Sequence, residues 1–314
     1  MNATVRVEVP ASSANLGPGF DSIGLALGLF DVVTATVVPD GLHITVEGEG
    51  AGVVPDDETH LVWRSMRAAW KRLGAPCPPG LKLHCANRIP HSRGLGSSAS
   101  AIVAGVAVAV ALAGSRSNGV GGLEDSNRAV INDIASDLEG HPDNASASVY
   151  GGFTLSWRDQ GQWQTIRPRV HADVVPVLFV PGSTLSTDRA RAVLPVSVPL
   201  ANAARTAGRA ALLTEAMTRR PELLLAASAE WVHQEARRSS YQSSMALVDT
   251  LRADGHAAAI SGAGPSVLVL TTRARADSVT TLGGSYNGDN AGSGSTWSRL
   301  MPGIAEHGVR VVSL

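Results

Sequence analysis

The stretch PHSRGLGSS at residues 90–98 carries the most information about the fold, because a strand-like segment precedes it and an apolar segment follows it. Residues 81–86 predict a strand, and the alanine-rich run 101–113 predicts a buried helix. A glycine and serine loop between a strand and a helix exposes backbone N–H groups at the positive end of that helix, where polyphosphates bind. We therefore predict a phosphate-binding loop that consists of Pro90, His91, Ser92, Arg93, Gly94, Leu95, Gly96, Ser97 and Ser98.

A simpler explanation of this loop is a turn that caps a core helix, with Ser97 or Ser98 as the N-cap residue. The sequence has no Gly-x-x-x-x-Gly-Lys-Ser/Thr string, which excludes the common P-loop kinases. Phosphate binding would therefore need a loop of a different type. Two further motifs favour phosphate binding over the simple helix cap.

Three motifs in this chain resemble those of the GHMP kinases, a superfamily that includes the galactokinase, homoserine kinase and mevalonate kinase families. PASSANLGPGFDSIGLAL at 10–27 resembles the first motif in its homoserine kinase form. The loop at 90–98 resembles the second motif, and AAISGAGPSV at 258–267 resembles the glycine-rich third one. Over most of residues 5–270 the likeness to homoserine kinases is extended by EGHPDN at 139–144, STDRARAVLP at 186–195 and HQEAR at 233–237.

The resemblance implies an α+β fold with two domains, which suits a chain of 314 residues. It implies an N-terminal, ATP-binding GHMP kinase domain at residues 1–155 with a left-handed βαβ crossover. A C-terminal GHMP kinase domain of ferredoxin-like form is then expected at residues 156–314. Nucleotide and acceptor would bind between the two domains.

Residue patterns predict the individual elements. Strands are expected at 4–9, 32–38, 42–46, 153–157, 174–180, 257–260 and 267–270. Further helices are expected at 58–73, 127–138, 201–217 and 222–237. Loops are expected at Ser12–Asp21, at 115–125 and at the glycine and serine-rich stretch Gly283–Ser295.

Composition excludes several classes of protein. The formal net charge is -1, without the basic excess that nucleic acid or anionic membranes require. The apolar run at 101–113 is shorter than the ~20 residues of a membrane-spanning helix, and the N-terminus lacks the apolar core of a signal peptide. Cys77 and Cys85 do not have metal-ligand spacing, so a reduced cytoplasm is the simplest location.

ATP and Mg²⁺ are the cofactors that the resemblance implies, with Ser98 and Glu139 as metal ligands and Ser97 as the fallback. Magnesium prefers oxygen ligands and commonly takes one or two from the protein. Glu139 could instead be a solvent-facing carboxylate at a helix C-terminus, although the helix dipole disfavours an anion there. His60 falls where the family usually has an asparagine near the adenine, and a solvated or capping histidine is the alternative.

An amino acid acceptor presents a carboxylate, which suits guanidinium groups, and an ammonium, which suits carboxylate or amide oxygens. By resemblance Arg191 and Arg237 clamp the carboxylate. The positions that match those around the amine and hydroxyl are Asn15, Asp21, His141 and Asn144. Each has an ordinary alternative, because Asn and Asp cap turns and most arginines are solvated.

The residues expected to take part in phosphoryl transfer are Asp21, Ser98, Glu139, Thr187 and Arg191. Asp21 is the only nearby candidate for a base, although its aligned role is to bind the acceptor, and Thr187 matches a threonine near the transferred phosphate. Gly262 and Gly264 would let the backbone approach the phosphate loop, with a plain hairpin turn as the alternative.

The sequence departs from the family pattern in three places that could lie near the acceptor: Glu235 and Ala236, Arg205 and Thr206, and Ser148. We expect ATP-dependent phosphorylation of the L-homoserine hydroxyl to O-phospho-L-homoserine in threonine biosynthesis, by a homodimer. The alternatives are a GHMP kinase acting on threonine or another hydroxylated amino acid, and a non-catalytic GHMP-fold binding protein.

Overall fold

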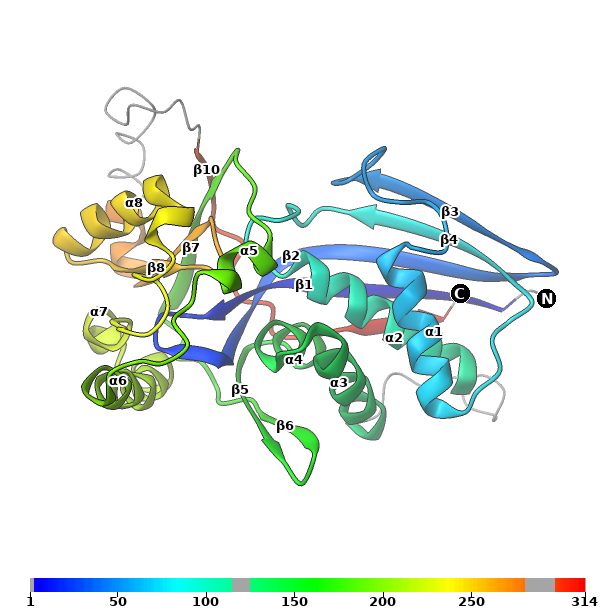
Figure 1. Ribbon diagram of the computed structural model, residues 1–314, viewed down its shortest axis with the longest axis horizontal. Coiled ribbons are helices and arrows are strands. Elements are labelled where there is room, and N and C mark those ends of the chain that lie inside the picture. The colour runs from blue at the N-terminus through cyan, green and yellow to red at the C-terminus, as the bar shows by residue number, and fades with distance from the viewer. Residues whose placement is uncertain (1–2, 115–124, 280–296, 314) are drawn as a thin grey trace.

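The structure is a computed structural model that describes residues 3–114, 125–279 and 297–313. It contains two β-sheets, each accompanied by helices (Figure 1). The seven-stranded first sheet has the order β11-β1-β2-β4-β3, with β5 pairing to β2 and β6 to β5. Its strands are β1 (Thr4–Asn15), β2 (Gly19–Val38), β3 (Gly41–Gly48), β4 (Gly80–Asn87), β5 (Phe153–Asp159), β6 (Gln162–Ile166) and β11 (Arg310–Ser313).

Four helices belong to the first sheet: α1 (Leu61–Leu73), α2 (Ser97–Gly114), α3 (Asp125–Glu139) and α4 (Pro142–Tyr150). Alternate residues of β1, namely Val5, Val7 and Val9, are buried in one apolar cluster with α1 and α2. Burial of such side chains is the main stabilising term, at about 25 cal/mol per Å² of apolar surface. The strands expected at 4–9, 32–38, 42–46 and 81–86 and the helices expected at 58–73, 101–113 and 127–138 are confirmed.

The first sheet contains the βαβ unit that the family resemblance implied. Strands β3 and β4 pair in parallel, with Gly41 opposite Gly80, and the chain passes from one to the other through α1. A parallel pair needs such a crossover, because a tight turn can only join antiparallel strands. Helix α2 then follows β4 through residues 88–96, which places the predicted phosphate loop at its N-terminus.

Helix α2 is apolar and long enough to cross a membrane by length and composition, but 67% of it is buried inside the protein. Its packing is close: a Cβ on Gly105 would lie 2.4 Å from the carbonyl oxygen of Val62 in α1. The helix therefore serves as the central core element of the first half, in agreement with the sequence-based interpretation.

The second sheet has four strands in the order β10-β7-β9-β8: β7 (Val174–Pro181), β8 (Ala257–Ile260), β9 (Val267–Thr272) and β10 (Trp297–Leu300). Numbered along the chain, this is the order 4-1-3-2 of a ferredoxin-like sheet. The helices here are α5 (Thr187–Ala192), α6 (Leu200–Thr218), α7 (Leu224–Ala227) and α8 (Gln242–Ala253), with 3₁₀ turns at Pro221–Leu223, Arg238–Ser240 and Arg273–Arg275.

The two halves share an apolar cluster. Leu25 and Phe153 of the first sheet pack in it with Leu213 of α6 and Leu268 of β9. The boundary predicted at residues 155 and 156 stays a prediction. Beyond it along the chain, most of β5 and all of β6 and β11 hydrogen-bond within the first sheet.

Two sequence-based expectations about local structure are wrong. The loop expected at Ser12–Asp21 is mostly strand, and only residues 16–18 form the turn between β1 and β2. The helix expected at 222–237 ends at Ala227, because the carboxylate of Glu230 accepts the backbone N–H groups of Val232, His233 and Gln234 and folds the chain into a turn. Most of the loop predicted at 115–125, and all of Gly283–Ser295, lie outside the described residues.

Candidate active site

The three glycine-containing motifs meet in one cavity of about 600 Å³. Ala14, Gly94 and Gly262, from three distant parts of the chain, all lie on its wall. The predicted site residues that line it are Asn15, Asp21, Ser92, Gly94, Gly96, Ser97, Ser98, Glu139, His141, Asn144, Thr187, Arg191, Arg237, Gly262 and Gly264.

Hydrogen bonds to backbone carbonyl groups hold the three motifs together. Ser12 N donates to Leu95 O at 3.1 Å, which joins the first motif to the phosphate loop. Gly262 N donates to Ala14 O at 3.1 Å, and Ser261 Oγ donates to Gly94 O at 2.6 Å. Direct hydrogen bonds therefore set the position of the motifs relative to one another.

The phosphate loop has two positions where only glycine fits. Gly94 has φ +73°, and a Cβ there would lie 2.2 Å from Ser261 O. Gly96 has φ +70°, and its Cβ would lie 2.1 Å from Ser12 Oγ. Residues other than glycine rarely adopt these angles, and the first contact is with backbone that cannot move aside. The two glycines therefore fix the shape of the loop that leads into the N-terminus of α2, where backbone N–H groups can bind phosphate.

We expect Gly94→Ala to raise the KM for ATP by at least about 10-fold and to lower the melting temperature, because the new methyl group would push the loop away from Ser261. Steady-state kinetics and thermal unfolding measure the two effects. Gly52→Ala is the matched control: Gly52 has φ +72°, but nothing lies within 4 Å of the place that a Cβ would take there. An equal KM for ATP in both variants would contradict this role of Gly94.

Arg93 supports the loop from outside the cavity. Its guanidinium donates to Pro181 O at 3.0 Å, Gly182 O at 3.2 Å and His91 O at 3.1 Å, which ties the loop to the end of β7. Asp31 accepts the N–H groups of Arg88 and Ile89 just before the loop, at 2.6 and 3.0 Å. These contacts hold the loop at both sides.

Five residues expected at the nucleotide site are not on the cavity wall: His60, Pro90, His91, Arg93 and Leu95. Leu95 is buried in the apolar cluster between the halves. His60 is 5% exposed and burial lowers its pKa, while its neighbour Leu61 lines the cavity. The predicted contact of His60 with adenine stays a prediction.

Ser98 and Glu139 lie together on the cavity wall. Ser98 Oγ donates to Glu139 Oε2 at 3.1 Å, and burial raises the pKa of Glu139 despite the opposing effects of His141 and Ser98. Within residues 3–114, 125–279 and 297–313 no ion pair neutralises Glu139. A carboxylate and a hydroxyl that lie together match the oxygen ligands that Mg²⁺ prefers, so these residues fit the ion.

Both arginines predicted to bind the acceptor line the cavity. Arg191 donates to both carboxylate oxygens of Asp21, at 2.6 and 3.1 Å. Arg237 is 1% exposed, and its Nε donates to Ala190 O at 2.9 Å, but its Nη1 has no hydrogen-bond partner within the part of the chain that the structure describes. Burial lowers the pKa of Arg237, with a smaller contribution from the nearby charge of Arg191. A buried cation of this kind calls for an anionic ligand.

Asn15 and Asn144 line the cavity, but their side chains already have protein partners. The amide of Asn15 accepts from Asp21 N at 3.0 Å and donates to Gly262 O at 3.1 Å. Asn144 Oδ1 accepts from Ser12 Oγ at 3.0 Å. The turn-capping alternative therefore describes Asn15 in this structure, and its contact with the acceptor stays a prediction.

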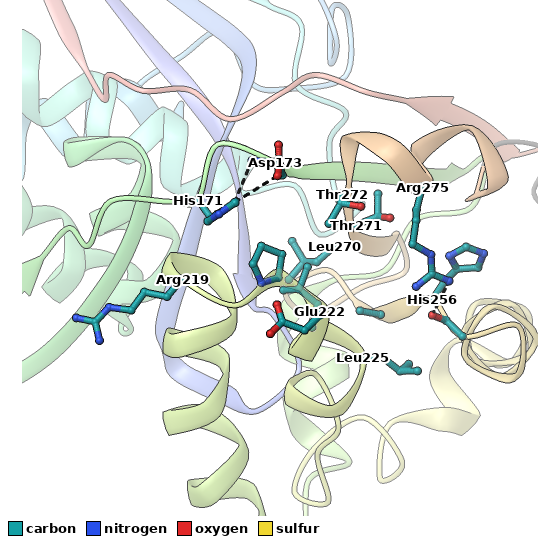
Figure 2. A pocket seen from close by; sticks show the side chains of 14 residues that line it. His171, Asp173, Arg219, Glu222, Leu225, His256, Leu270, Thr271, Thr272 and Arg275 are labelled. Atoms are coloured by element: carbon teal, nitrogen blue, oxygen red, sulfur yellow. Dashed lines mark hydrogen bonds and ion pairs between the residues drawn. The ribbon is translucent and has the colours of Figure 1, made fainter.

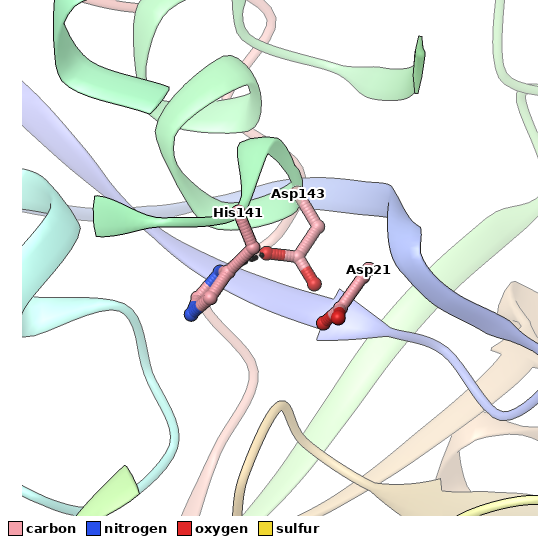
Figure 3. Close-up of side chains that lie close together, drawn as sticks. All are labelled: Asp21, His141 and Asp143. Carbon is pink, nitrogen blue, oxygen red and sulfur yellow. Dashed lines mark hydrogen bonds and ion pairs between the residues drawn. The ribbon is translucent and has the colours of Figure 1, made fainter. Parts of the chain in front are cut away.

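Sequence reasoning missed Asp143, although EGHPDN contains it. Figure 3 shows Asp143 between His141 and Asp21, and Asp143 Oδ1 lies 2.8 Å from His141 Nδ1. Burial lowers the pKa of His141, but the hydrogen bond and the charges of Asp143 and Glu139 outweigh it, so the pKa is raised. These three side chains could hold a metal ion, but Asp21 is paired with Arg191 and His141 with Asp143. The fit to Mg²⁺ is therefore better at Ser98 and Glu139.

The family departures do not line the cavity as far as the described residues go. Glu235 and Ala236 lie at a separate surface hollow with Arg238. Thr206 Oγ1 accepts from Trp231 N, and the guanidinium of Arg205 lies over the Trp231 ring. Ser148 Oγ donates to Pro10 O at the start of the first motif. Any influence on the acceptor would be indirect.

A second cavity of about 500 Å³ lies against β8, β9 and the end of α6 (Figure 2). Arg275 and His256 lie on one side of it, and His171 and Asp173 on the other. None of the three motifs contributes to it. The residues predicted to bind phosphate therefore lie at the first cavity and not at this one.

Known proteins share both the sequence and the fold of this chain. Residues 60–152 match the model of the GHMP kinases N terminal domain, and residues 202–281 match that of the GHMP kinases C terminal. A homoserine kinase of Streptomyces avermitilis is 54% identical over 282 residues, with 90% of each chain covered. A homoserine kinase of Streptomyces coelicolor is 49% identical over 312 residues, covering 99% of this chain and 96% of that one.

Solved structures agree at the level of the fold. The crystal structure of homoserine kinase from Cytophaga hutchinsonii has a TM-score of 0.81 at 23% identity and covers 99% of this chain and 98% of its own. Mevalonate diphosphate decarboxylase from Staphylococcus aureus has a TM-score of 0.67 at 17% identity, with 99% and 98% covered. The fold thus serves more than one reaction, and sequence identity decides the family. The chain belongs to the GHMP kinase superfamily and, within it, to the homoserine kinase family.

Proposed function

We propose that this protein transfers the γ-phosphoryl group of ATP to the side-chain hydroxyl of L-homoserine and so forms O-phospho-L-homoserine for threonine biosynthesis. The observation that carries the proposal is one cavity that is lined both by the glycine phosphate loop and by buried Arg237, whose Nη1 has no hydrogen-bond partner among the described residues. By analogy with the family, we further propose that the protein is a cytoplasmic homodimer that binds neither nucleic acid nor membranes.

The phosphate loop would position the nucleotide through backbone N–H groups of residues 94–98 at the start of α2. Ser98 and Glu139 would hold Mg²⁺, which when bound supplies neutralisation of the charge on the phosphate oxygens. Thr187 lies at the first position of α5 on the cavity wall, where its hydroxyl and the helix end can face the transferred group.

The acceptor would bind as a zwitterion. Its carboxylate would accept hydrogen bonds from Arg237 Nη1, which has no partner among the described residues, and from one side of the Arg191 guanidinium. Its ammonium would donate to the carboxylate of Asp21. Exchange of partners of this kind keeps every charge paired, so binding leaves no isolated ion in the cavity. In the transfer step the hydroxyl oxygen bonds to the γ-phosphorus, the bond from that phosphorus to the bridging oxygen of ADP breaks, and the hydroxyl proton is released.

Positioning and charge account for this reaction better than a dedicated base does. Both carboxylate oxygens of Asp21 accept hydrogen bonds from Arg191, so Asp21 is engaged in an ion pair rather than directed at a hydroxyl. Phosphoryl transfer of this type depends mainly on in-line geometry and on neutralised phosphate charge.

We expect Mg-ATP turnover to be strongest with L-homoserine in a panel with L-threonine, L-serine, mevalonate and galactose, measured as ADP release against a control without acceptor. The reason is that the arginine pair and Asp21 match the carboxylate and the ammonium of an α-amino acid, whereas mevalonate has no ammonium group to pair with Asp21. Preference for another hydroxylated amino acid would keep the kinase and change the acceptor. No turnover with any acceptor would favour a non-catalytic binding protein.

A further inference from the structure

Phe20 lies beside both guanidinium groups at the acceptor end, although the lining residues identified in the described part of the chain do not include it. The guanidinium carbon of Arg191 is 5.7 Å from the centroid of the Phe20 ring, and that of Arg237 is 5.6 Å from it. A cation within about 6 Å of an aromatic ring is attracted by the negative charge of the ring face. One ring therefore contacts two cations from separate segments of the chain.

The ring is itself held in place. The ring of His233 stacks on Phe20 with centroids 5.0 Å apart and an angle of 27° between the planes. His233 Nε2 lies 2.8 Å from Gly17 O, in the turn that leads to Phe20. Gly17 has φ +91°, and a Cβ there would lie 2.4 Å from Ser228 O, so this turn packs directly against the segment that contains His233.

The same segment places Arg237. The carboxylate of Glu230 accepts from His233 N at 2.9 Å and from Gln234 N at 2.8 Å. Arg237 N then donates to His233 O at 3.2 Å and to Gln234 O at 3.1 Å. One compact turn thus sets the position of Arg237 relative to His233, and Phe20 contacts both.

The Phe20 ring offsets the repulsion between the guanidinium groups of Arg191 and Arg237. Two guanidinium groups carry like charges and repel each other, and the repulsion grows as they approach. Arg191 has Asp21 as its ion-pair partner, whereas no ion pair among the described residues joins Arg237 to a carboxylate, and its Nη1 has no hydrogen-bond partner there. A carboxylate at this place would take up the hydrogen-bond donors that a ligand needs, while a ring face attracts the cations and leaves those donors free.

We propose that Phe20 is a positioning residue that holds Arg191 and Arg237 together as one clamp for the α-carboxylate of the acceptor. This inference rests on the proposed function. Phe20 acts through the arginines and contacts neither substrate, so its removal affects recognition of the carboxylate and leaves nucleotide binding unchanged.

Phe20→Leu keeps an apolar side chain and removes the ring. It is expected to raise the KM for L-homoserine about 5- to 30-fold, with kcat and the KM for ATP within about 2-fold of the parent protein. Phe20→Tyr keeps the ring and is expected to retain the parent KM. Phe20→Met serves in place of Phe20→Leu if thermal unfolding shows that the leucine variant is not folded.

A second measurement separates carboxylate recognition from simple packing. L-2-Aminobutanoic acid and its amide differ only in the carboxylate. The inhibition constant of the amide divided by that of the acid, both measured against L-homoserine, therefore reports on the clamp. Phe20→Leu is expected to reduce that ratio by the same factor as it raises the KM, while Phe20→Tyr keeps it. A packing role would instead weaken both inhibitors equally, and that result would overturn the inference.

The failure of this inference can be told from the failure of the proposed function. If the parent protein phosphorylates L-homoserine and Phe20→Leu leaves its KM unchanged, only the role of Phe20 is wrong. If the parent protein phosphorylates none of the acceptors in the panel, the proposed function fails and the clamp role of Phe20 falls with it.

Discussion

Glu139→Gln is expected to lower kcat about 100- to 1,000-fold, the largest effect that we predict for a single substitution. Glutamine keeps the shape of the side chain and the contact with Ser98 Oγ, but it removes the charge that would hold Mg²⁺ at the phosphates. Loss of one group that stabilises charge in the transition state commonly costs about 3–4 kcal/mol. Because the parent carboxylate has no cationic partner among the described residues, its removal breaks no ion pair there, and folding should be little affected.

Two measurements check this prediction. Steady-state kinetics at several Mg²⁺ concentrations should show that the variant needs more Mg²⁺ for half-maximal rate as well as having a lower kcat. Glu215→Gln is the matched control, since Glu215 lies near the end of α6 and its carboxylate pairs with exposed Arg219 at 3.6 Å. A kcat within about 3-fold of the parent value for Glu139→Gln would remove Glu139 from the metal site.

Arg237→Ala is expected to raise the KM for L-homoserine about 100-fold or more, with the KM for ATP nearly unchanged. Removal of one partner of a buried, hydrogen-bonded charge pair costs about 2–5 kcal/mol, because the remaining charge is left without a partner. Arg237→Lys keeps the charge and loses the planar fork, so its KM should lie between those of the parent and the alanine variant. Arg191→Ala should also raise the acceptor KM, since it leaves Asp21 unpaired.

The neighbouring residue provides the control for this experiment. Arg238 is partly exposed and pairs with Glu235 and Asp249, at 2.7 and 2.8 Å, outside the cavity. Arg238→Ala should therefore leave both KM values within about 2-fold of the parent. Thermal unfolding of Arg237→Ala tests for lost stability, because Ala190 O loses its donor. An unchanged acceptor KM in both Arg191→Ala and Arg237→Ala would contradict the proposal that these two arginines bind the acceptor carboxylate.

Much of the fold follows from local patterns in the sequence. The alternation in β1, the glycine loop and the apolar run of α2 are each properties of neighbouring residues, and the structure has these elements where they were expected. The expected helix at 222–237 failed for a local reason of a different kind. The side chain of Glu230 competes for backbone N–H groups, and periodicity does not register such competition.

Candidate residues could be chosen from the motifs, but not all of their contacts could. Asn15 and Asp21 were both expected at the acceptor. In the structure, the amide of Asn15 spans two backbone groups, while Asp21 is paired to Arg191. Asp143 was passed over beside His141 and Asn144, because no feature of EGHPDN distinguishes a buried carboxylate from an exposed one.

The sequence by itself determined the family, the phosphate loop with its obligatory glycines and the set of residues that could carry the reaction. Only the tertiary structure decided which of two adjacent arginines is buried, which carboxylate pairs with Arg191 and which ring lies beside both guanidinium groups. The physical reason is that charge pairing and burial depend on distances in space. Asp21 and Arg191 are 170 residues apart in the chain, and only folding brings them to 2.6 Å.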